Sequence, residues 1–193
     1  MYFLADLHIH SPYSRATSKD MELETLSRWA QLKGLTVIGT GDFTHPRWFS
    51  NLQKKLEETG DGLYMLKGEY RALGSDGVPQ SCYREVRFIL SSEVSCIYRK
   101  GGRTRKAHHI ILSPTFEAAA RVNETLSKIG NLGADGRPIL GLDSKVLLRI
   151  VLDASIDNLL IPAHAWTPHF SVLGSNSGFN SLEECFEELT PHI

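Results

Sequence analysis

Short apolar runs alternate along this chain with amphipathic stretches, and glycine or polar residues separate them. The apolar runs have the length of buried strands, whereas the amphipathic stretches repeat apolar residues at the spacing of one helix face. We therefore expect strands at residues 2–5, 35–38, 86–90, 95–98, 107–112 and 159–161. Helices are expected at about 23–33, 48–58, 116–129, 144–154 and 181–189. Residues 60–78 give no clear pattern.

The order of these elements indicates the fold class. Strands that alternate with helices favour an α/β fold with a largely parallel sheet. Polar residues repeatedly follow the carboxyl ends of the expected strands, which is typical of a barrel with one functional face. Gly34 is placed to end the first helix, and Ser181 with Glu184 forms a capping box that begins the last one.

Composition narrows the class of protein only slightly. A chain of 193 residues can bury one good core, and its net charge of −1 points to no particular partner. No apolar run approaches the roughly 18 residues of a membrane span, and we expect no membrane partner. Cys82, Cys96 and Cys185 match no zinc-finger or redox spacing. This cysteine usage and the lack of a secretory signal favour a reducing, cytoplasmic location.

The first strand leads directly into Asp6-Leu7-His8-Ile9-His10. Side chains alternate between the two faces of an extended chain, so Asp6, His8 and His10 should point the same way. A lone histidine is usually an ordinary core or surface residue. Histidines spaced for one face at the end of a strand instead predict half of a metal site, which the rest of the chain must complete.

Further metal-competent residues follow or end other expected strands. They are Asp42, His45, Glu93, one of His108 and His109, and His164. His108 and His109 alternate faces, so at most one of them points into the site. Each residue has a structural explanation on its own, since Asp42 could cap a helix and His45 could lie in a surface loop. Their recurrence at several strand ends predicts a centre for zinc, manganese or iron, with a bridging carboxylate such as Glu93.

These motifs resemble the polymerase-and-histidinol-phosphatase (PHP) domain family over the whole chain. More narrowly, the chain resembles endonuclease Q enzymes in Asp6-Leu7-His8-Ile9-His10-Ser11, Ala16-Thr17-Ser18-Lys19-Asp20-Met21, Trp29-Ala30-Gln31-Leu32-Lys33-Gly34-Leu35, Gly39-Thr40-Gly41-Asp42 and Arg105-Lys106-Ala107-His108-His109. Relatives of this kind are sometimes labelled UvrD-type DNA helicases. The chain has no Gly-x-x-x-x-Gly-Lys-Ser/Thr loop, so a helicase activity is not expected.

The resemblance implies a distorted (βα)7 TIM-like barrel with two or three divalent ions (zinc, manganese or magnesium) that hydrolyses phosphoesters. Within the endonuclease Q group it implies a DNA repair endonuclease that nicks 5′ of deaminated bases such as uracil and hypoxanthine. Transferred to this sequence, His8, His10 and Glu93 would hold one ion, and Glu93, His109 and His164 a second. Asp42 and His45 are candidates for a third ion, and Glu93 and Asp42 would be catalytic.

Two departures from the PHP pattern are visible. Phe43 follows Asp42 where many members have an Asp-His pair, so His45 is the substitute candidate. The family's last motif, an Asp-x-His on a final strand, is absent before Ile193. We therefore expect residues 1–193 to form a C-terminally incomplete PHP domain that lacks its last strands, binds fewer ions than a complete one and has little activity.

Cationic residues extend the expected site. Arg15 and Lys19 should overhang the metal centre and neutralise a phosphate, although a solvated loop explains them equally well. Arg103, Arg105 and Lys106 belong to a basic strip, residues 99–106, that is suited to a DNA backbone. Two alternatives remain: a small-molecule phosphatase of the histidinol-phosphate type, which would not need the basic strip, and a metal-stabilised scaffold that binds DNA without cutting it.

Overall fold

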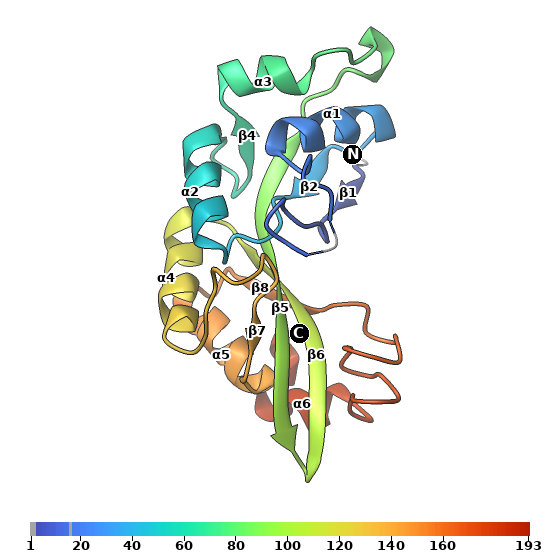
Figure 1. Ribbon diagram of the computed structural model, residues 1–193, viewed down its shortest axis with the longest axis vertical. Helices are drawn as coiled ribbons and strands as arrows, with labels where there is room; N and C mark the ends of the chain where they lie inside the picture. The colour runs from blue at the N-terminus through green and yellow to red at the C-terminus, as the bar shows by residue number, and fades with distance from the viewer. Residues whose placement is uncertain (1–2, 16) are drawn as a thin grey trace.

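The computed structural model describes residues 3–15 and 17–193, so Tyr2 of the first apolar run and Ala16 of the Ala16–Met21 motif lie outside the described residues. The described chain forms a curled, mixed sheet of eight strands with helices packed against it (Figure 1). One end of the sheet contains β1 (Ala5–Asp6), β2 (Val37–Gly39), β3 (Leu56–Glu58) and β4 (Tyr64–Leu66). β1, β2 and the start of β5 are parallel, and β4 and β3 extend the sheet in the antiparallel sense.

A long β-ribbon forms the other end of the sheet. β5 (Arg87–Lys100) and β6 (Arg103–Ser113) are antiparallel and meet at Gly101 and Gly102, whose φ angles of 60° and 74° suit a tight hairpin turn. β8 (Leu159–Pro162) pairs with β6 in the antiparallel sense, and β7 (Ile139–Leu140) runs parallel to β5. The tip of this ribbon extends past α6 at one end of the molecule (Figure 1).

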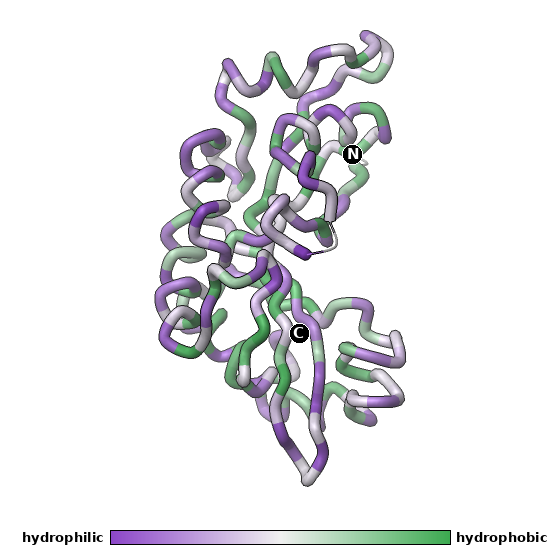
Figure 2. The backbone as a smooth tube through the Cα atoms, viewed as in Figure 1, coloured by the Kyte–Doolittle hydropathy of each residue, from purple (hydrophilic) through white to green (hydrophobic). Residues whose placement is uncertain are grey.

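Six α-helices accompany the strands in the described chain: α1 (Leu23–Lys33), α2 (Pro46–Lys55), α3 (Gly68–Gly74), α4 (Phe116–Ser127), α5 (Ser144–Ala154) and α6 (Leu182–Phe186). Residues 80–82 and 187–192 form 3₁₀ turns. The main core lies between the helices and the sheet and includes the fully buried Trp48, Phe88 and Leu147. Hydrophobic segments run along the strands, and hydrophilic segments lie on the outer turns of the helices (Figure 2). No helix in the described chain is long and apolar enough to cross a membrane.

The helix predictions are confirmed for most of the chain. α1 ends at Gly34 with a φ of 80°, and α5 has the expected bounds. The Ser181 hydroxyl accepts a hydrogen bond from the backbone N–H of Glu184, as the capping box predicts, although α6 ends early at Phe186. The helix expected at 48–58 stops at Lys55, because residues 56–58 pair with β4 and form β3.

Two predictions about the sheet are wrong. The expected strands at 86–90 and 95–98 are one continuous strand, so Glu93 lies inside β5 and not after it. The sheet is mixed and not largely parallel, since the hairpin turn returns β6 beside β5. The curled sheet is consistent with a TIM-like fold, but it forms half of a barrel and not a closed one.

Candidate metal centre

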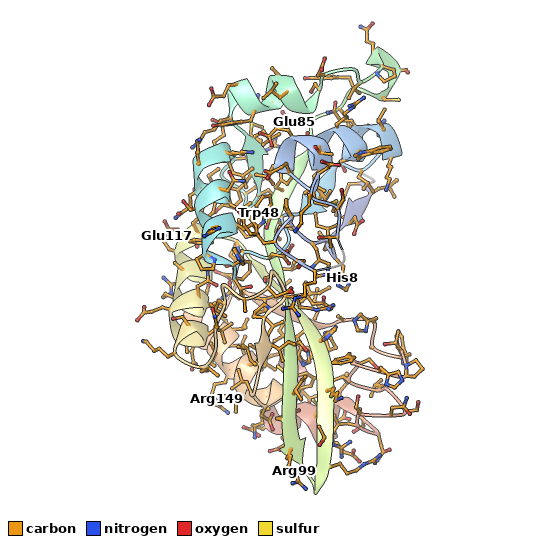
Figure 3. The ribbon with its side chains drawn as sticks, viewed as in Figure 1. His8, Trp48, Glu85, Arg99, Glu117 and Arg149 are labelled. Carbon is orange, nitrogen blue, oxygen red and sulfur yellow. The ribbon has the colours of Figure 1, made fainter. Side chains whose placement is uncertain are left out.

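Glu93 lies at the centre of a group of histidines. Its side chain is 1% exposed and points from the middle of β5 to the sheet face that carries His108 of β6. His108 Nδ1 lies 3.0 Å, His8 Nε2 3.3 Å and His164 Nε2 3.4 Å from Glu93 Oε1. His10 Nε2 lies 3.2 Å from Glu93 Oε2. In Figure 3 His8 is at the middle of the molecule, beside the crossing of β5 and β6.

Neighbouring strands bring these side chains together. His8 and His10 follow β1, and His164 follows β8 in a turn where its φ angle is 33°. Glu93 is paired with Ile110, so His108, two residues before Ile110, lies on the same face of the ribbon. The segments that follow the carboxyl ends of β1 and β8 therefore meet at the Glu93 carboxylate. His8 and His10 point into the same cluster, as predicted, but the exposed Asp6, which was expected to share their direction, stays outside it.

The side chains form two groups that could each hold a cation. His8, His10 and Glu93 make one, and Glu93, His108 and His164 make the other, with donor atoms within 4.8 Å of one another in each group. Glu93 Oε1 has no hydrogen bond of regular geometry within the described residues, although three imidazole nitrogens surround it. His108 Nδ1 also faces His164 Nε2 at 3.2 Å. Imidazole nitrogens and one shared carboxylate are a donor set for zinc, manganese or iron, so these residues fit the predicted ions.

Burial and mutual contacts control the charges at the centre. Burial alone would raise the pKa of Glu93, but the neighbouring imidazoles of His10, His108 and His8 hold that pKa far below its usual range. Burial lowers the pKa of His10, but its hydrogen bonds to Asp42 and Glu93 outweigh this effect and raise the pKa to about 9. Burial also lowers the pKa of His164. Glu93 is thus a stable anion that a cation can use as a ligand.

Asp42 orients His10. It lies in a strained turn with a φ of 50°, next to Gly41 with a φ of 64°. Its Oδ2 accepts hydrogen bonds from Ser11 N at 2.7 Å, Ser11 Oγ at 2.6 Å and Ser14 Oγ at 3.0 Å. Its Oδ1 lies 3.0 Å from His10 Nδ1, which leaves His10 Nε2 for Glu93 and a metal. Asp42 belongs to neither ligand group, so the geometry gives it a positioning role.

His45 is also outside both groups. It is the residue before α2, is 6% exposed, and stacks on the Tyr13 ring with the two centroids 4.2 Å apart. Burial lowers its pKa, and its Nδ1 has no hydrogen-bond partner within the described part of the chain. Neither Asp42 nor His45 thus belongs to a ligand group among the described residues, and the third ion expected from the sequence stays a prediction.

The structure places His108, and not His109, beside Glu93 and His164, where His109 was expected. His109 points to the opposite face of β6, where it is fully buried. Its Nε2 lies 2.8 Å from Ser144 Oγ, and its ring meets Phe186 edge-on. Burial and the nearby His108 lower the pKa of His109 to about 3, so it is a neutral core residue. Strand alternation alone left this choice open, and only the register resolves it.

The predicted phosphate-binding cations are not all free. Lys19 Nζ donates a hydrogen bond to the carbonyl of Pro12, and Arg15, whose side chain is 88% exposed, lies 3.3 Å from Asp135. In the basic strip, Lys106 shares the face of His108, with its Nζ 5.5 Å from the centre of the Phe170 ring. Arg103 and Arg105 alternate to the other face, and Arg105 stacks on Phe179.

Arg137 is a site residue that the sequence patterns missed. Its Nη1 lies 3.2 Å from Glu93 Oε2, although residues 131–142 read only as a glycine-rich connection. Two of the three glycines in this segment, Gly133 and Gly136, were a signal next to Arg137, because glycine permits close approach of a loop to another group. A Cβ at Gly136 would collide with the Asp42 carboxylate, so the loop rests directly on the centre.

A curled α/β sheet with a buried carboxylate ringed by histidines defines a candidate metal centre. No protein-family model matches the chain. Among solved structures, the chain is similar to the lesion-specific endonuclease PfuEndoQ from Pyrococcus furiosus, with a TM-score of 0.74 and 30% identity over 95% of this chain and 39% of that one. It is equally similar to an endonuclease Q bound to a 27-mer duplex with an abasic lesion at the active site, of which it covers 40%.

Two curated proteins are also similar to the chain. The uncharacterized protein MJ0043 of Methanocaldococcus jannaschii is 30% identical over 92% of this chain and 18% of its own length. The uncharacterized protein YqxK of Bacillus subtilis is 26% identical over 95% of this chain and 45% of its own length. The chain therefore spans less than half the length of each of these proteins. These comparisons support the endonuclease Q resemblance without testing the PHP assignment.

Proposed function

We propose that residues 1–193 form a PHP-type domain of a metal-dependent phosphodiesterase that repairs DNA by nicking 5′ of deaminated bases such as uracil and hypoxanthine. The observation that supports this proposal most is the set of histidines that share Glu93 in a chain 30% identical to a lesion-specific endonuclease. Two ions, one in each ligand group, are the proposed cofactors, and damaged DNA is the proposed partner.

The position of each site residue indicates its proposed role. His8, His10 and Glu93 would hold one ion, and Glu93, His108 and His164 the other, where the ions supply an activated water and neutralise phosphate charge. Asp42 holds His10 in the orientation that directs Nε2 to the centre. Glu93 compensates part of the positive charge, and its burial keeps that compensation in a low-dielectric setting. These roles require no third ion.

The β5–β6 ribbon is the proposed track for the DNA backbone. It starts at the metal centre with Glu93 and His108 and ends in a turn flanked by Arg99 and Arg103 (Figure 3, where Arg99 is labelled). Lys106 lies between the turn and the centre on the metal-site face. A duplex bound along this ribbon would have its phosphates close to these cationic side chains, between the hairpin turn and the metal-ligand residues. A small phosphate monoester is too short to contact such an extended row of cations. The ribbon therefore favours a nuclease function over a phosphatase function.

A nicking assay tests the proposed function. The chain is incubated with Mn²⁺ and an end-labelled duplex that contains one uracil, beside the same duplex without uracil and a phosphate monoester. Because little activity is expected of residues 1–193, we expect only weak nicking 5′ of the uracil, and chelation should abolish it. Release of phosphate from the monoester without nicking would establish the phosphatase instead. DNA binding without any hydrolysis by the metal-loaded chain would establish the non-catalytic scaffold.

The basic strip gives a prediction about salt. Replacing Arg103, Arg105 and Lys106 with glutamine should weaken binding about equally for damaged and undamaged duplexes, because phosphate contacts carry no sequence information. The slope of log affinity against log salt concentration should flatten by roughly one unit for each phosphate that the variant no longer neutralises. Arg149→Gln, at an exposed cation on α5, is the control. An unchanged slope in the triple variant would show that the strip is only a solvated turn.

A further inference from the structure

Arg137 contacts the metal centre, but no metal-ligand or DNA-track role accounts for it. The guanidinium lies 3.2 Å from Glu93 Oε2, the same oxygen that His10 Nε2 approaches at 3.2 Å. Its side chain is 41% exposed, whereas the carboxylate it meets is buried. One end of this ion pair is therefore open to solvent and to a ligand, and the other end belongs to the centre.

The loop that carries Arg137 is held in place from several sides. Gly136 N donates a hydrogen bond to the Tyr13 carbonyl, and Arg137 N donates one to Asp135 Oδ1. Asp135 in turn pairs with Arg15, and the Pro138 carbonyl accepts a hydrogen bond from Ser95 N of β5. The loop is thus held both by Tyr13, in the segment after β1, and by β5. These contacts fix the direction in which the Arg137 guanidinium points.

Arg137 borders a pocket next to the second ligand group, of which His108 lines the pocket. The pocket has a volume of about 410 Å³ and is lined by His108, Ser95, Phe170 and Arg15 among others. Ser95 is 1% exposed, and its Oγ has no hydrogen-bond partner within the described residues. Ser95 and Glu93 are two residues apart on β5 and so share a face. A buried hydroxyl without a partner and a guanidinium at the same pocket are donors for an oxygen-rich ligand.

We propose that Arg137 binds two oxygens of the phosphoester that the centre cleaves, with that group seated in this pocket. The inference rests on the proposed phosphoesterase function. Cations held by Glu93 would repel the guanidinium that now shares its carboxylate, and an anion between them relieves this repulsion. The planar guanidinium matches two phosphate oxygens at once. Arg137 is thus an ion-pair partner of Glu93 that transfers its contact to the substrate.

If Arg137 has this role, its replacement should affect the affinity for Mn²⁺ and the affinity for inorganic phosphate in different ways. Arg137→Gln removes a cation that competes for Glu93, so Mn²⁺ should bind at least as tightly as before, by calorimetry without substrate. Inorganic phosphate should bind the Mn²⁺-loaded variant roughly 10–100-fold more weakly, the decrease expected when a charge-assisted hydrogen bond is removed. Arg137→Lys, which keeps the charge without the bidentate geometry, should fall between the parent and Arg137→Gln. Arg149→Gln should change neither affinity.

The outcomes separate the possibilities. Parental phosphate affinity in Arg137→Gln would overturn the proposal. Metal and phosphate affinities that fall together would also overturn it, because they would show that Arg137 only supports the structure of the centre. Phosphate binding is measured without DNA, so failure of the chain to nick uracil-containing duplexes would contradict the proposed function and leave this test intact. If the chain does nick, Arg137→Gln should lower kcat/KM at unchanged metal content.

Discussion

Replacing Glu93 with glutamine is expected to abolish metal binding in both ligand groups at once. The substitution keeps the shape of the side chain and removes the negative charge that the two groups share. Metal affinity measured by calorimetry should fall by roughly two orders of magnitude or more, and nicking should fall at least as far. Duplex affinity in the absence of added metal should stay within about twofold, because the basic strip is unchanged.

The control for this prediction is Glu57→Gln. Glu57 is a partly exposed residue of β3 that pairs with Arg71 and lies outside both ligand groups. Its replacement should leave metal affinity and nicking at the parental level. If Glu93→Gln bound metal and nicked DNA like the parent, Glu93 could not be the shared ligand. Circular dichroism of both variants would show whether the fold is kept.

The adjacent histidines of β6 give the second large expected difference. His108→Ala should release the ion of the second ligand group, because His108 Nδ1 is directed at Glu93 Oε1. His109→Ala should keep that ion but lower the free energy of unfolding by about 2–4 kcal/mol, because it leaves a cavity in the core and removes the hydrogen bond between His109 and Ser144. Measuring the metal content and the urea unfolding of both variants tests whether one loses metal while the other loses stability.

Each variant of this pair is the control of the other. Reduced metal content in His109→Ala together with parental metal content in His108→Ala would restore the assignment made from the sequence. Unfolding is best followed in metal-free buffer, since bound metal stabilises the folded state by mass action. In that buffer we expect His108→Ala to be the less destabilised of the two, because His108 lies at the edge of the pocket beside Arg137.

The sequence predicted which residues belong to this site better than it predicted how they are arranged. His8, His10 and His164 could be recognised because each follows a short apolar run that ends in polar residues. Glu93 was recognised for the wrong local reason, since it lies within a 14-residue strand and not after one. Apolar and polar positions mix along β5, as one end of the strand packs in the core and the middle faces the site. The apolar residues of such a strand follow no single periodicity, so the sequence pattern does not show its full length.

Other features depended on contacts between distant segments. The choice between His108 and His109 required the register of β5 and β6, which pairs Glu93 with Ile110. The place of Arg137 required the loop from 131 to 142 to fold back onto Tyr13 and Asp42, and such long-range contacts leave no periodic signal. The half-closed sheet was anticipated from the resemblance to PHP domains and not from hydrophobic periodicity.

The central claim is that Glu93 bridges two metal ions held by four histidines. Anomalous X-ray diffraction from crystals of the Mn²⁺-loaded chain, recorded on both sides of the manganese absorption edge, tests this claim most directly. We predict two peaks on either side of the Glu93 carboxylate, one beside His8 and His10 and the other beside His108 and His164. Peaks beside His45 or His109, or no peak beside Glu93, would contradict it.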